Sequence, residues 1–353
     1  MLHLASGKIL IIPTDTVWGL AVKPDSPGAY AGLMKLKKRK PGKSFPVITS
    51  ELEQGLALFS EPSPPLKLLC SQFWPGPLTV ISKARSGIPC HLTDKNKFLA
   101  VRVPLPPTPL HLIKAFQYLV ATSANLSDLP TGSNIYKVAE SFKPHSPPYW
   151  GSMVNLLPRQ SSTVAGYRKN KIEVYRKGAL DITRIINLTG SIRYVCEQPL
   201  NVLIVCKGNT CRSPLAEVIA NQIISPRFNY RVKFNSAGLE TDHTCTQLSP
   251  AVKKILKNKY KWEKTKLPQK LTSLHTTNAD FILAMEDRQI EALKQIGGDH
   301  KVFKLTGFSS SHPDIPDPWE KGESQYILVE QMIADALDDF SAYLKKSVFD
   351  LQQ

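Results

Sequence analysis

Two side chains six residues apart, Cys206 and Arg212, carry the most chemical information in the sequence. They belong to the stretch Cys-Lys-Gly-Asn-Thr-Cys-Arg-Ser-Pro, which directly follows the apolar run 201–205. The pattern predicts a buried strand, a loop that begins with a thiol, and a helix with Ser213 as N-cap and Pro214 as first residue. Such a loop directs several backbone N–H groups at one point and binds anions there. We expect Cys206 to be a thiolate at neutral pH, the nucleophile that phosphoester hydrolysis through a cysteinyl-phosphate requires.

This reaction also needs an acid that protonates the leaving atom and then activates water. The candidate is Asp317 in the segment Asp-Ile-Pro-Asp-Pro-Trp, and Asp314 in the same segment is the alternative. An Asp-Pro pair by itself more often marks a plain turn. The assignment therefore depends on the thiol loop upstream.

The thiol loop and the distant Asp-Pro-aromatic tripeptide together resemble the low-molecular-weight protein phosphatase family, over about residues 200–345. The resemblance implies that phosphorylated proteins are the substrates and that no cofactor is needed. It implies that Cys206 is the nucleophile, Arg212 the phosphoryl-binding residue and Asp317 the general acid. It also implies that Ser213 hydrogen-bonds the thiolate and that Asn209 holds the shape of the loop.

Thr210 and Trp319 are the expected specificity positions, and two departures from the family pattern, Lys207 and Glu320, leave the substrate preference open. Members that resemble protein-arginine phosphatases carry threonine at the position of Thr210, and Trp319 is expected to flank the entrance. Both phosphotyrosine and phosphoarginine remain candidate substrates. Arsenate reduction is disfavoured because it needs further downstream cysteines and only Cys245 follows.

The first half carries a series of polar motifs, each of them weak by itself. Lys37-Lys38-Arg39 alone would be a solvated helix end, and Ser123-Ala124-Asn125 alone would be a turn. The segment Gly42-Lys43-Ser44 is not a Walker A motif, because Lys37 stands where the earlier glycine is required. The other members of the series are Pro13–Leu20, Pro75–Thr79, Val101–Pro104, Ser162–Val164 and Arg176–Gly178.

As an ordered set these motifs resemble the YrdC-like threonylcarbamoyl-AMP synthase family over about residues 1–182. The resemblance implies condensation of L-threonine, bicarbonate and ATP, with Mg²⁺ bound to the nucleotide, and a product used for the threonylcarbamoyl modification of tRNA. tRNA itself or the transfer complex is then a possible partner. The family match implies ATP-contacting residues at Lys37, Arg39, Lys43, Asn125, Ser133 and Arg176, and threonine-contacting residues at Thr16, Arg102, Ser123 and Ser162. Two departures concern threonine affinity: Ile48 stands where histidine is common, and Gly166 where aspartate is expected.

Charge and length divide the chain in two. Residues 1–199 have a net charge of +14 and residues 200–353 a net charge of +2. A basic first half indicates polyanionic partners such as nucleoside triphosphates or RNA. The length of 353 residues predicts two domains, which we place at 1–182 and 200–353 with a linker at 183–199.

The fold class predicted for both domains is α/β. The first domain is expected to be a twisted mixed sheet, with strands at 8–12, 45–49, 78–82, 99–103, 119–122 and 172–175 and helices at 28–38 and 111–118. The second alternates strands and helices, ending in a helix from about 325 to 344, which predicts a doubly wound parallel sheet.

No apolar run approaches the ~18 residues of a membrane span, so a cytoplasmic enzyme without a membrane partner is expected. The six cysteines form no Cys-x-x-Cys pair and no His-Glu-x-x-His motif occurs, so no metal site is expected. Cys206 and Cys211 share one short loop and are candidates to pair under oxidation.

Two alternative functions remain open from the sequence. The basic first half could be an RNA-binding module without catalysis, and the second half could be a regulatory domain without turnover. Neither the reason for the fusion nor the oligomeric state follows from the sequence.

Overall fold

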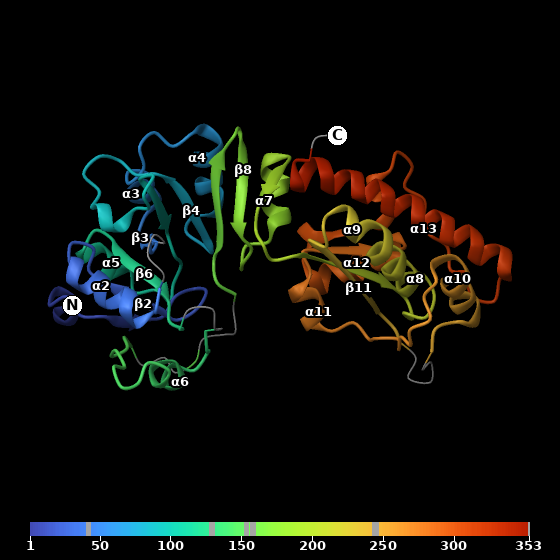
Figure 1. Cartoon of the computed structure of the whole chain (residues 1–353), viewed down its shortest axis with the longest axis horizontal. Helices are drawn as coiled ribbons and strands as arrows, with labels where there is room; N and C mark the ends of the chain where they lie inside the picture. Colours follow the sequence, from blue (N-terminus) through green and yellow to red (C-terminus); the bar gives the residue numbers. More distant parts are fainter. Residues whose placement is uncertain (40–43, 127–130, 152–154, 156–159, 242–246, 352–353) are drawn as a thin grey trace. The chain divides into compact units, whose positions relative to one another are not determined.

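The computed structural model describes residues 1–353 except 40–43, 127–130, 152–154, 156–159, 242–246 and 352–353. The chain divides into two compact units, Met1–Leu180 and Asp181–Gln353 (Figure 1). Each unit has its own sheet and its own core. Within the described residues, no helix combines the length and the apolar character that a membrane span requires.

The first unit is built on a mixed sheet with strand order β1-β2-β6-β3-β5-β4-β7-β8. The β3–β5 and β4–β7 pairs are parallel and the other pairs are antiparallel. This confirms the predicted mixed-sheet α/β fold. The strands are β1 (Leu10–Ile12), β2 (Gly19–Val22), β3 (Val47–Ile48), β4 (Leu78–Lys83), β5 (Phe98–Arg102), β6 (Leu119–Ser123), β7 (Thr163–Arg168) and β8 (Lys171–Arg176).

The helices of the first unit begin at recognisable signals. In α2, Ser26 caps the N-terminus by accepting a hydrogen bond from Ala29 N at 3.3 Å, and Pro27 occupies the first helical position. Leu112 and Ile113 of α5 pack with strand residues Ile12 and Leu119 in a buried cluster. The helices are α1 (Leu2–Ala5), α2 (Pro27–Leu36), α3 (Leu52–Leu56), α4 (Pro64–Phe73), α5 (Leu110–Ala115) and α6 (Ile135–Glu140), with the short turn η1 (Cys90–Leu92).

The second unit contains a parallel sheet with strand order β11-β10-β12-β13. Helices α8, α10 and α13 contact one another, and α8 packs on β10 and β11, while α12 packs on β12 and β13. Successive residues of β12 face opposite layers: the Phe281 ring meets Phe340 of α13, and Ile282 packs with Leu293 of α12. The doubly wound parallel sheet predicted from the sequence is confirmed.

The elements of the second unit follow in chain order. They are α7 (Ile182–Thr189), β9 (Ile192–Tyr194), β10 (Leu200–Cys206), α8 (Arg212–Ile219), η2 (Ala220–Ile224), α9 (Ser225–Arg227), β11 (Val232–Gly238), α10 (Pro250–Tyr260), α11 (Ser273–Asn278), β12 (Phe281–Ala284), α12 (Asp287–Gly297), η3 (Asp299–Lys301), β13 (Val302–Lys304), η4 (Leu305–Phe308), α13 (Glu323–Tyr343) and η5 (Leu344–Phe349).

The segment 183–199, expected to be a linker, is structured. It holds most of α7 and all of β9, and it belongs to the second compact unit. Ile182, Ile185 and Ile186 bury one face of α7, and Asp181 at its N-terminus pairs with His300 at 2.5 Å. This helix has only eight residues, so its amphipathic pattern extends over too few turns to predict it from the sequence.

The helix after the thiol loop begins earlier than the sequence predicts. It starts at Arg212, and the N-cap position is Cys211, whose side chain makes no cap hydrogen bond. Ser213, expected to be the N-cap, lies in the first turn instead. Its hydroxyl group contacts Cys206 and Asn209 rather than a helix N–H group, so the loop chemistry takes precedence over capping.

Gly166 on β7 gives a first testable prediction. A Cβ atom at this position would lie 2.7 Å from the backbone oxygen of Ile81, its partner on β4. We expect Gly166→Ala to destabilise the first unit by about 1–3 kcal/mol through overpacking. The measurement is the urea midpoint of unfolding, followed by tryptophan fluorescence. Gly28→Ala is the matched control, because a Cβ there meets no atom within 4 Å; equal midpoints for the two variants would contradict the packing argument.

Candidate active sites

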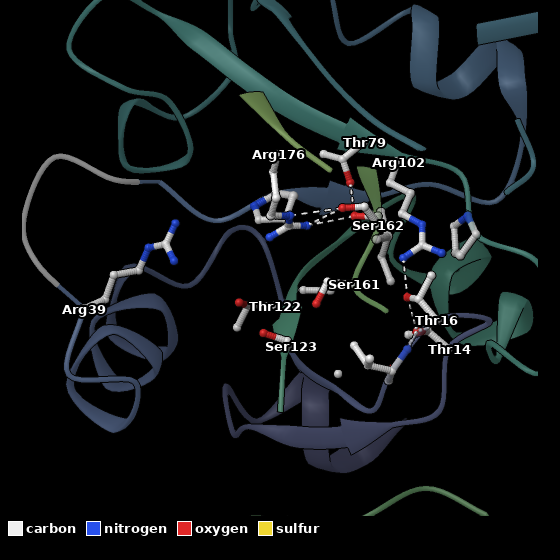
Figure 2. A pocket seen from close by; sticks show the side chains of 16 residues that line it. Thr14, Thr16, Arg39, Thr79, Arg102, Thr122, Ser123, Ser161, Ser162 and Arg176 are labelled. Carbon is white, nitrogen blue, oxygen red and sulfur yellow. Dashed lines mark hydrogen bonds between the residues drawn. The ribbon is translucent and has the colours of Figure 1, made fainter. Parts of the chain in front are cut away.

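Polar side chains from several strands meet at one end of the sheet in the first unit and line a cavity (Figure 2). The register explains their convergence: Arg102 at the end of β5 lies opposite Thr79 of β4 and Ile48 of β3, and Arg176 at the end of β8 lies opposite Val164 of β7. The lining residues are Thr14, Thr16, Val17, Gly19, Arg39, Pro46, Ile48, Thr79, Arg102, Pro104, Ala121, Thr122, Ser123, Ser161, Ser162 and Arg176.

Arg102 is held in place by a buried network. Its Nη2 atom lies 2.6 Å from Asp15 Oδ1, its Nη1 atom donates to Thr16 Oγ1 at 2.8 Å, and its Nε atom donates to the backbone oxygen of Gly76 at 3.0 Å. Burial lowers the pKa of Arg102, and the Asp15 carboxylate offsets part of that effect. These contacts use three of the five N–H groups of the guanidinium, so the group is oriented and still has donors for a carboxylate in the cavity.

A second cluster joins Ser162, Thr79 and Arg176. The Ser162 and Thr79 hydroxyl oxygens are 2.8 Å apart. Arg176 Nη2 donates to the Ser162 backbone oxygen at 2.8 Å and to its hydroxyl at 3.1 Å. Figure 2 shows the Arg176 and Arg102 side chains on either side of Ser162. Among the described residues, the cavity is lined by three arginines, and two of them, Arg102 and Arg176, have hydroxyl groups between them.

Lys37 lies beside this cavity but does not line it. Its ammonium group donates to the backbone oxygens of Ser123 and Asn125 at 2.8 and 2.5 Å, and to Asn125 Oδ1 at 2.7 Å. Ser123 Oγ also donates to Asn125 Oδ1 at 2.6 Å. The lysine is 2% exposed. The Lys-x-Arg and Ser-x-Asn motifs thus meet, and Lys37 positions the turn after β6.

Of the remaining residues expected to bind ATP, some line the cavity and others do not. Arg39 lines the cavity, with its guanidinium 4.6 Å from the centre of the Phe45 ring. Ser133 does not line it; its backbone oxygen accepts a hydrogen bond from the buried Trp18 indole at 2.7 Å. Lys43 lies outside the described residues.

The two departures from the family pattern, Ile48 and Gly166, differ in their position relative to the cavity. Ile48 lines the cavity and is 5% exposed, so an apolar side chain occupies part of its wall. Gly166 is not among the lining residues. Its close approach to β4 requires the absence of a side chain, which gives it a packing role in this chain.

The thiol loop of the second unit connects the end of β10 to the start of α8. The Cys206 sulfur lies 3.0 Å from Ser213 Oγ and accepts a hydrogen bond from Asn209 N at 3.3 Å. The predicted nucleophile and Ser213 are therefore in direct contact. Cys206 and Cys211 are both free thiols.

Asn209 holds the loop in shape. It is fully buried and has a left-handed backbone with φ of +53°. Its Nδ2 atom donates to Ser213 Oγ and Ser236 Oγ, both at 2.8 Å, and its Oδ1 atom accepts from Gln269 N at 2.8 Å. Gly238 allows the loop to approach β11, because a Cβ there would lie 2.9 Å from backbone atoms of the loop.

Arg212 is enclosed by carboxylates. It is 1% exposed, its Nη1 atom contacts Glu286 Oε1 and donates to the Ile315 backbone oxygen at 3.0 Å, and its Nη2 atom lies 2.7 Å from Asp317 Oδ2. Burial raises the pKa of Glu286, but hydrogen bonds from Arg288 and Arg212 outweigh it and leave that pKa below its usual value. Glu286 therefore stays ionised and holds Arg212, while the half-exposed Asp317 is the partner that faces solvent.

The alternative acid Asp314 is engaged elsewhere. Its Oδ1 atom accepts from Asp287 N at 3.1 Å and pairs with Lys304 at 3.2 Å. The described contacts of Asp314 do not reach the thiol loop. The geometry thus places Asp317, and not Asp314, next to Arg212.

The two specificity positions flank the loop. Thr210 accepts a hydrogen bond at its backbone oxygen from Ser249 N at 3.1 Å, which ties the loop to the start of α10. Trp319 is 48% exposed, and its backbone N–H donates to Asp317 Oδ1 at 3.3 Å. Trp319 is thus next to the expected acid on an exposed surface.

Several residues of these sites were not assigned from the sequence: Asp15, Thr79, Ser236 and Glu286. Asp15 and Thr79 stand inside recognised motifs, so their position carried a signal. Glu286 follows β12, whose carboxyl end lies beside that of β10 in a parallel sheet, and side chains at such ends converge. A search of residues just after each parallel strand would have found it.

Comparison with known proteins agrees with this geometry. Residues 3–178 match the sequence model of the Sua5/YciO/YrdC family, described as "Telomere recombination", and residues 201–350 match that of "Low molecular weight phosphotyrosine protein phosphatase". A threonylcarbamoyl-AMP synthase of Alkalilimnicola ehrlichii is 35% identical over 137 residues, which are 38% of this chain and 71% of that protein.

Two solved structures are also similar. Sua5 of Pyrococcus abyssi, in complex with L-threonine, has a TM-score of 0.51 at 21% identity and covers 86% of this chain and 94% of its own. A mutant of YwlE from Bacillus subtilis has a TM-score of 0.38 at 27% identity and covers 41% of this chain and 99% of its own.

The chain belongs to the Sua5/YciO/YrdC family through its first half, and its second half is a low-molecular-weight phosphatase domain. It is thus a fusion of a threonylcarbamoyl-AMP synthase domain with a protein phosphatase domain, as the sequence predicted.

Asn209 gives a prediction for the thiol loop. Asn209→Ala removes the hydrogen bonds to the buried hydroxyl groups of Ser213 and Ser236 and to the Gln269 backbone N–H. We expect kcat for a small aryl phosphate to fall about ten- to a hundredfold. Asn229→Ala is the matched control, because Asn229 also has a left-handed backbone (φ +50°) but is exposed. We expect the control to change kcat less than about twofold, because no such network is lost. An equal loss in both variants would show that the backbone conformation, and not the side-chain network, matters.

Proposed function

We propose that the chain is a bifunctional enzyme whose first unit forms threonylcarbamoyl-adenylate from L-threonine, bicarbonate and ATP and releases pyrophosphate. The observation that carries this proposal is the cavity in which two guanidinium groups flank Ser162. A carbamate carboxylate must reach the α-phosphorus of ATP, so the site has to bring two anions together, which oriented cations allow.

We assign the following roles to residues in and near this cavity. Arg102 binds the threonine carboxylate, with Thr16, Ser123 and Ser162 around the amino acid. Arg39 and Arg176 contact the nucleotide, with Asn125, Ser133 and Lys43 as further expected ATP contacts. Lys37 acts by positioning the turn that carries Asn125.

Mg²⁺ is expected to enter with the nucleotide. The cavity lining contains no carboxylate and no imidazole among the described residues, so the protein offers cations and hydroxyl groups rather than a metal cage. This fits a Mg²⁺ ion that is bound mainly by phosphate oxygens and water. The adenylate is then a donor for the modification of tRNA, directly or through a transfer complex.

For the second unit we propose hydrolysis of phosphotyrosine or phosphoarginine in proteins through a cysteinyl-phosphate. Support comes from one cluster: the Cys206 sulfur in contact with Ser213, and Arg212 between the loop and Asp317. Arg212 binds the phosphoryl oxygens, Cys206 attacks phosphorus, and Asp317 donates a proton to the leaving oxygen or nitrogen and then activates water. Thr210 and Trp319 flank the substrate and affect its choice.

The synthase proposal predicts pyrophosphate release from ATP that depends on both L-threonine and bicarbonate. Arg39→Gln is expected to lower kcat/KM for ATP about ten- to a hundredfold, because a charged contact to phosphate is lost. Arg85→Gln, at an exposed position, is the control and should leave kcat/KM for ATP unchanged. A pyrophosphate assay tests this. RNA binding without any threonine-dependent pyrophosphate release would instead support the alternative of an RNA-binding module.

The phosphatase proposal predicts turnover of para-nitrophenyl phosphate that Cys206→Ser abolishes. Asp317→Asn should reduce hydrolysis of a phosphopeptide about 10²–10⁴-fold, because its leaving group needs a proton. The loss should be smaller for para-nitrophenyl phosphate, whose leaving group is good. Asp314→Asn is the matched control. If Asp314→Asn shows the larger loss, the acid assignment is wrong, and absence of turnover in the wild type favours a regulatory domain.

A further inference from the structure

Positive charge in the second half is concentrated in one stretch. Residues 247–270 contain eight lysines and a single acid, Glu263, whereas the rest of 200–353 has a net charge of −5. This stretch comprises α10 and the chain that follows it. The near-neutral total of the second half therefore conceals a strongly basic surface.

The same stretch lines a cavity of about 610 Å³. In α10, Val252 and Leu256 face the core, so Lys253 and Lys257, four residues apart, lie together on the exposed side. The wall opposite is formed by the chain after the helix, including the half-buried Trp262 and the exposed Lys264. The cavity thus combines cationic groups with one aromatic ring and with the Glu263 carboxylate, which is paired with Lys257.

Both ends of this stretch are hydrogen-bonded to the thiol loop. At the start, Ser249 N donates to the Thr210 backbone oxygen at 3.1 Å. At the other end, Gln269 N donates to Asn209 Oδ1 at 2.8 Å. The cavity is therefore built on a segment that starts and finishes at the catalytic loop. A substrate held by that loop has this segment beside it.

Not all of the lysines are equally available to an anion. Lys254, Lys257, Lys259 and Lys266 are paired with acidic residues at 2.7 to 3.1 Å. Lys253 lies 2.5 Å from the neutral amide oxygen of Gln247, and the described residues give Lys264 no ion pair. Lys253 and Lys264 are thus the cavity lysines whose charge is not neutralised by the described residues.

We propose that this cavity is a docking site for an acidic side chain, Asp or Glu, that lies two to four residues from the phosphorylated residue of a protein substrate. This inference rests on the proposed phosphatase function. Lys253 is four residues along α10 from Ser249, about 6 Å of helix, and an extended peptide advances about 3.3 Å per residue. A short peptide segment therefore spans the thiol loop and the cavity, with its carboxylate at Lys253 and Lys264.

A peptide accounts for these observations better than a nucleic acid does. The segment that carries the docking residues is hydrogen-bonded at Ser249 and Gln269 to the loop that binds the phosphoryl group, so one peptide can reach both places. A cavity with two available lysines and one aromatic ring suits a single acidic side chain rather than a line of phosphates, which a long basic stripe would serve.

Charge reversal tests the proposal. We expect the wild type to hydrolyse phosphotyrosine and phosphoarginine peptides that carry Asp or Glu near the phosphorylated residue with a kcat/KM about three- to tenfold higher than peptides that carry Ala there. High salt should reduce this preference. Lys253→Glu with Lys264→Glu should remove this preference and favour peptides with Lys instead. Glu at 253 suits the first turns of a helix, so the fold should persist. Lys233→Glu, an exposed lysine on β11, is the control.

The outcomes separate this inference from the phosphatase function. Turnover of para-nitrophenyl phosphate should be the same in all these proteins, and its absence from the wild type contradicts the phosphatase function itself. Binding of the same peptides to Cys206→Ser protein, followed by fluorescence anisotropy, tests docking without turnover. Equal binding of acidic and Ala peptides overturns the docking proposal. The proposal is also overturned if the variant with Lys253→Glu and Lys264→Glu loses affinity for single-stranded RNA but keeps its preference for acidic peptides.

Discussion

Both units depend on burying an arginine next to a carboxylate that compensates its charge and orients it. Arg102 and Arg212 are 7% and 1% exposed, and each touches an acidic partner from a distant part of the chain, Asp15 and Glu286. A buried charge without such a partner would be strongly destabilising. With it, the guanidinium is fixed before any ligand arrives. An anion that enters the site then meets donors that need little reorganisation.

The backbone supplies the second part of each site in a different way. In the first unit, strand ends bring side chains from sequence-distant motifs to one end of the sheet, so no single segment makes the site. In the second unit, one loop carries the nucleophile and the arginine, and Asn209 keeps that loop in a conformation that most residues avoid. The first site is therefore assembled by the fold. The second site is formed by one continuous segment of the sequence, and the fold supports that segment.

This difference explains how much the sequence could predict. The thiol loop was recognisable because Cys206, Arg212 and Ser213 lie within eight residues, and the parallel sheet followed from alternating strands and helices. Glu286 follows a parallel strand and could have been selected as a candidate, but its contact with Arg212 could not be predicted. The same holds for the hydrogen bonds from Lys37 to Asn125, because both contacts depend on which strands are neighbours. The start of α8 was misplaced because capping rules treat Ser213 as a local residue, whereas its hydroxyl bonds to the loop. The helix at 182–189 was missed because its amphipathic pattern covers about two turns.

We expect Arg212 to keep Glu286 as a permanent partner and to give up Asp317 when a phosphoryl group binds. A crystal structure with tungstate, an unreactive stand-in for phosphate, tests this most directly. We expect tungstate next to the Cys206 sulfur, in contact with Arg212 and the loop N–H groups, with the Arg212–Glu286 contact intact and the Asp317 carboxylate released. Tungstate bound away from the sulfur, or an Arg212 that leaves Glu286 and stays with Asp317, would contradict it.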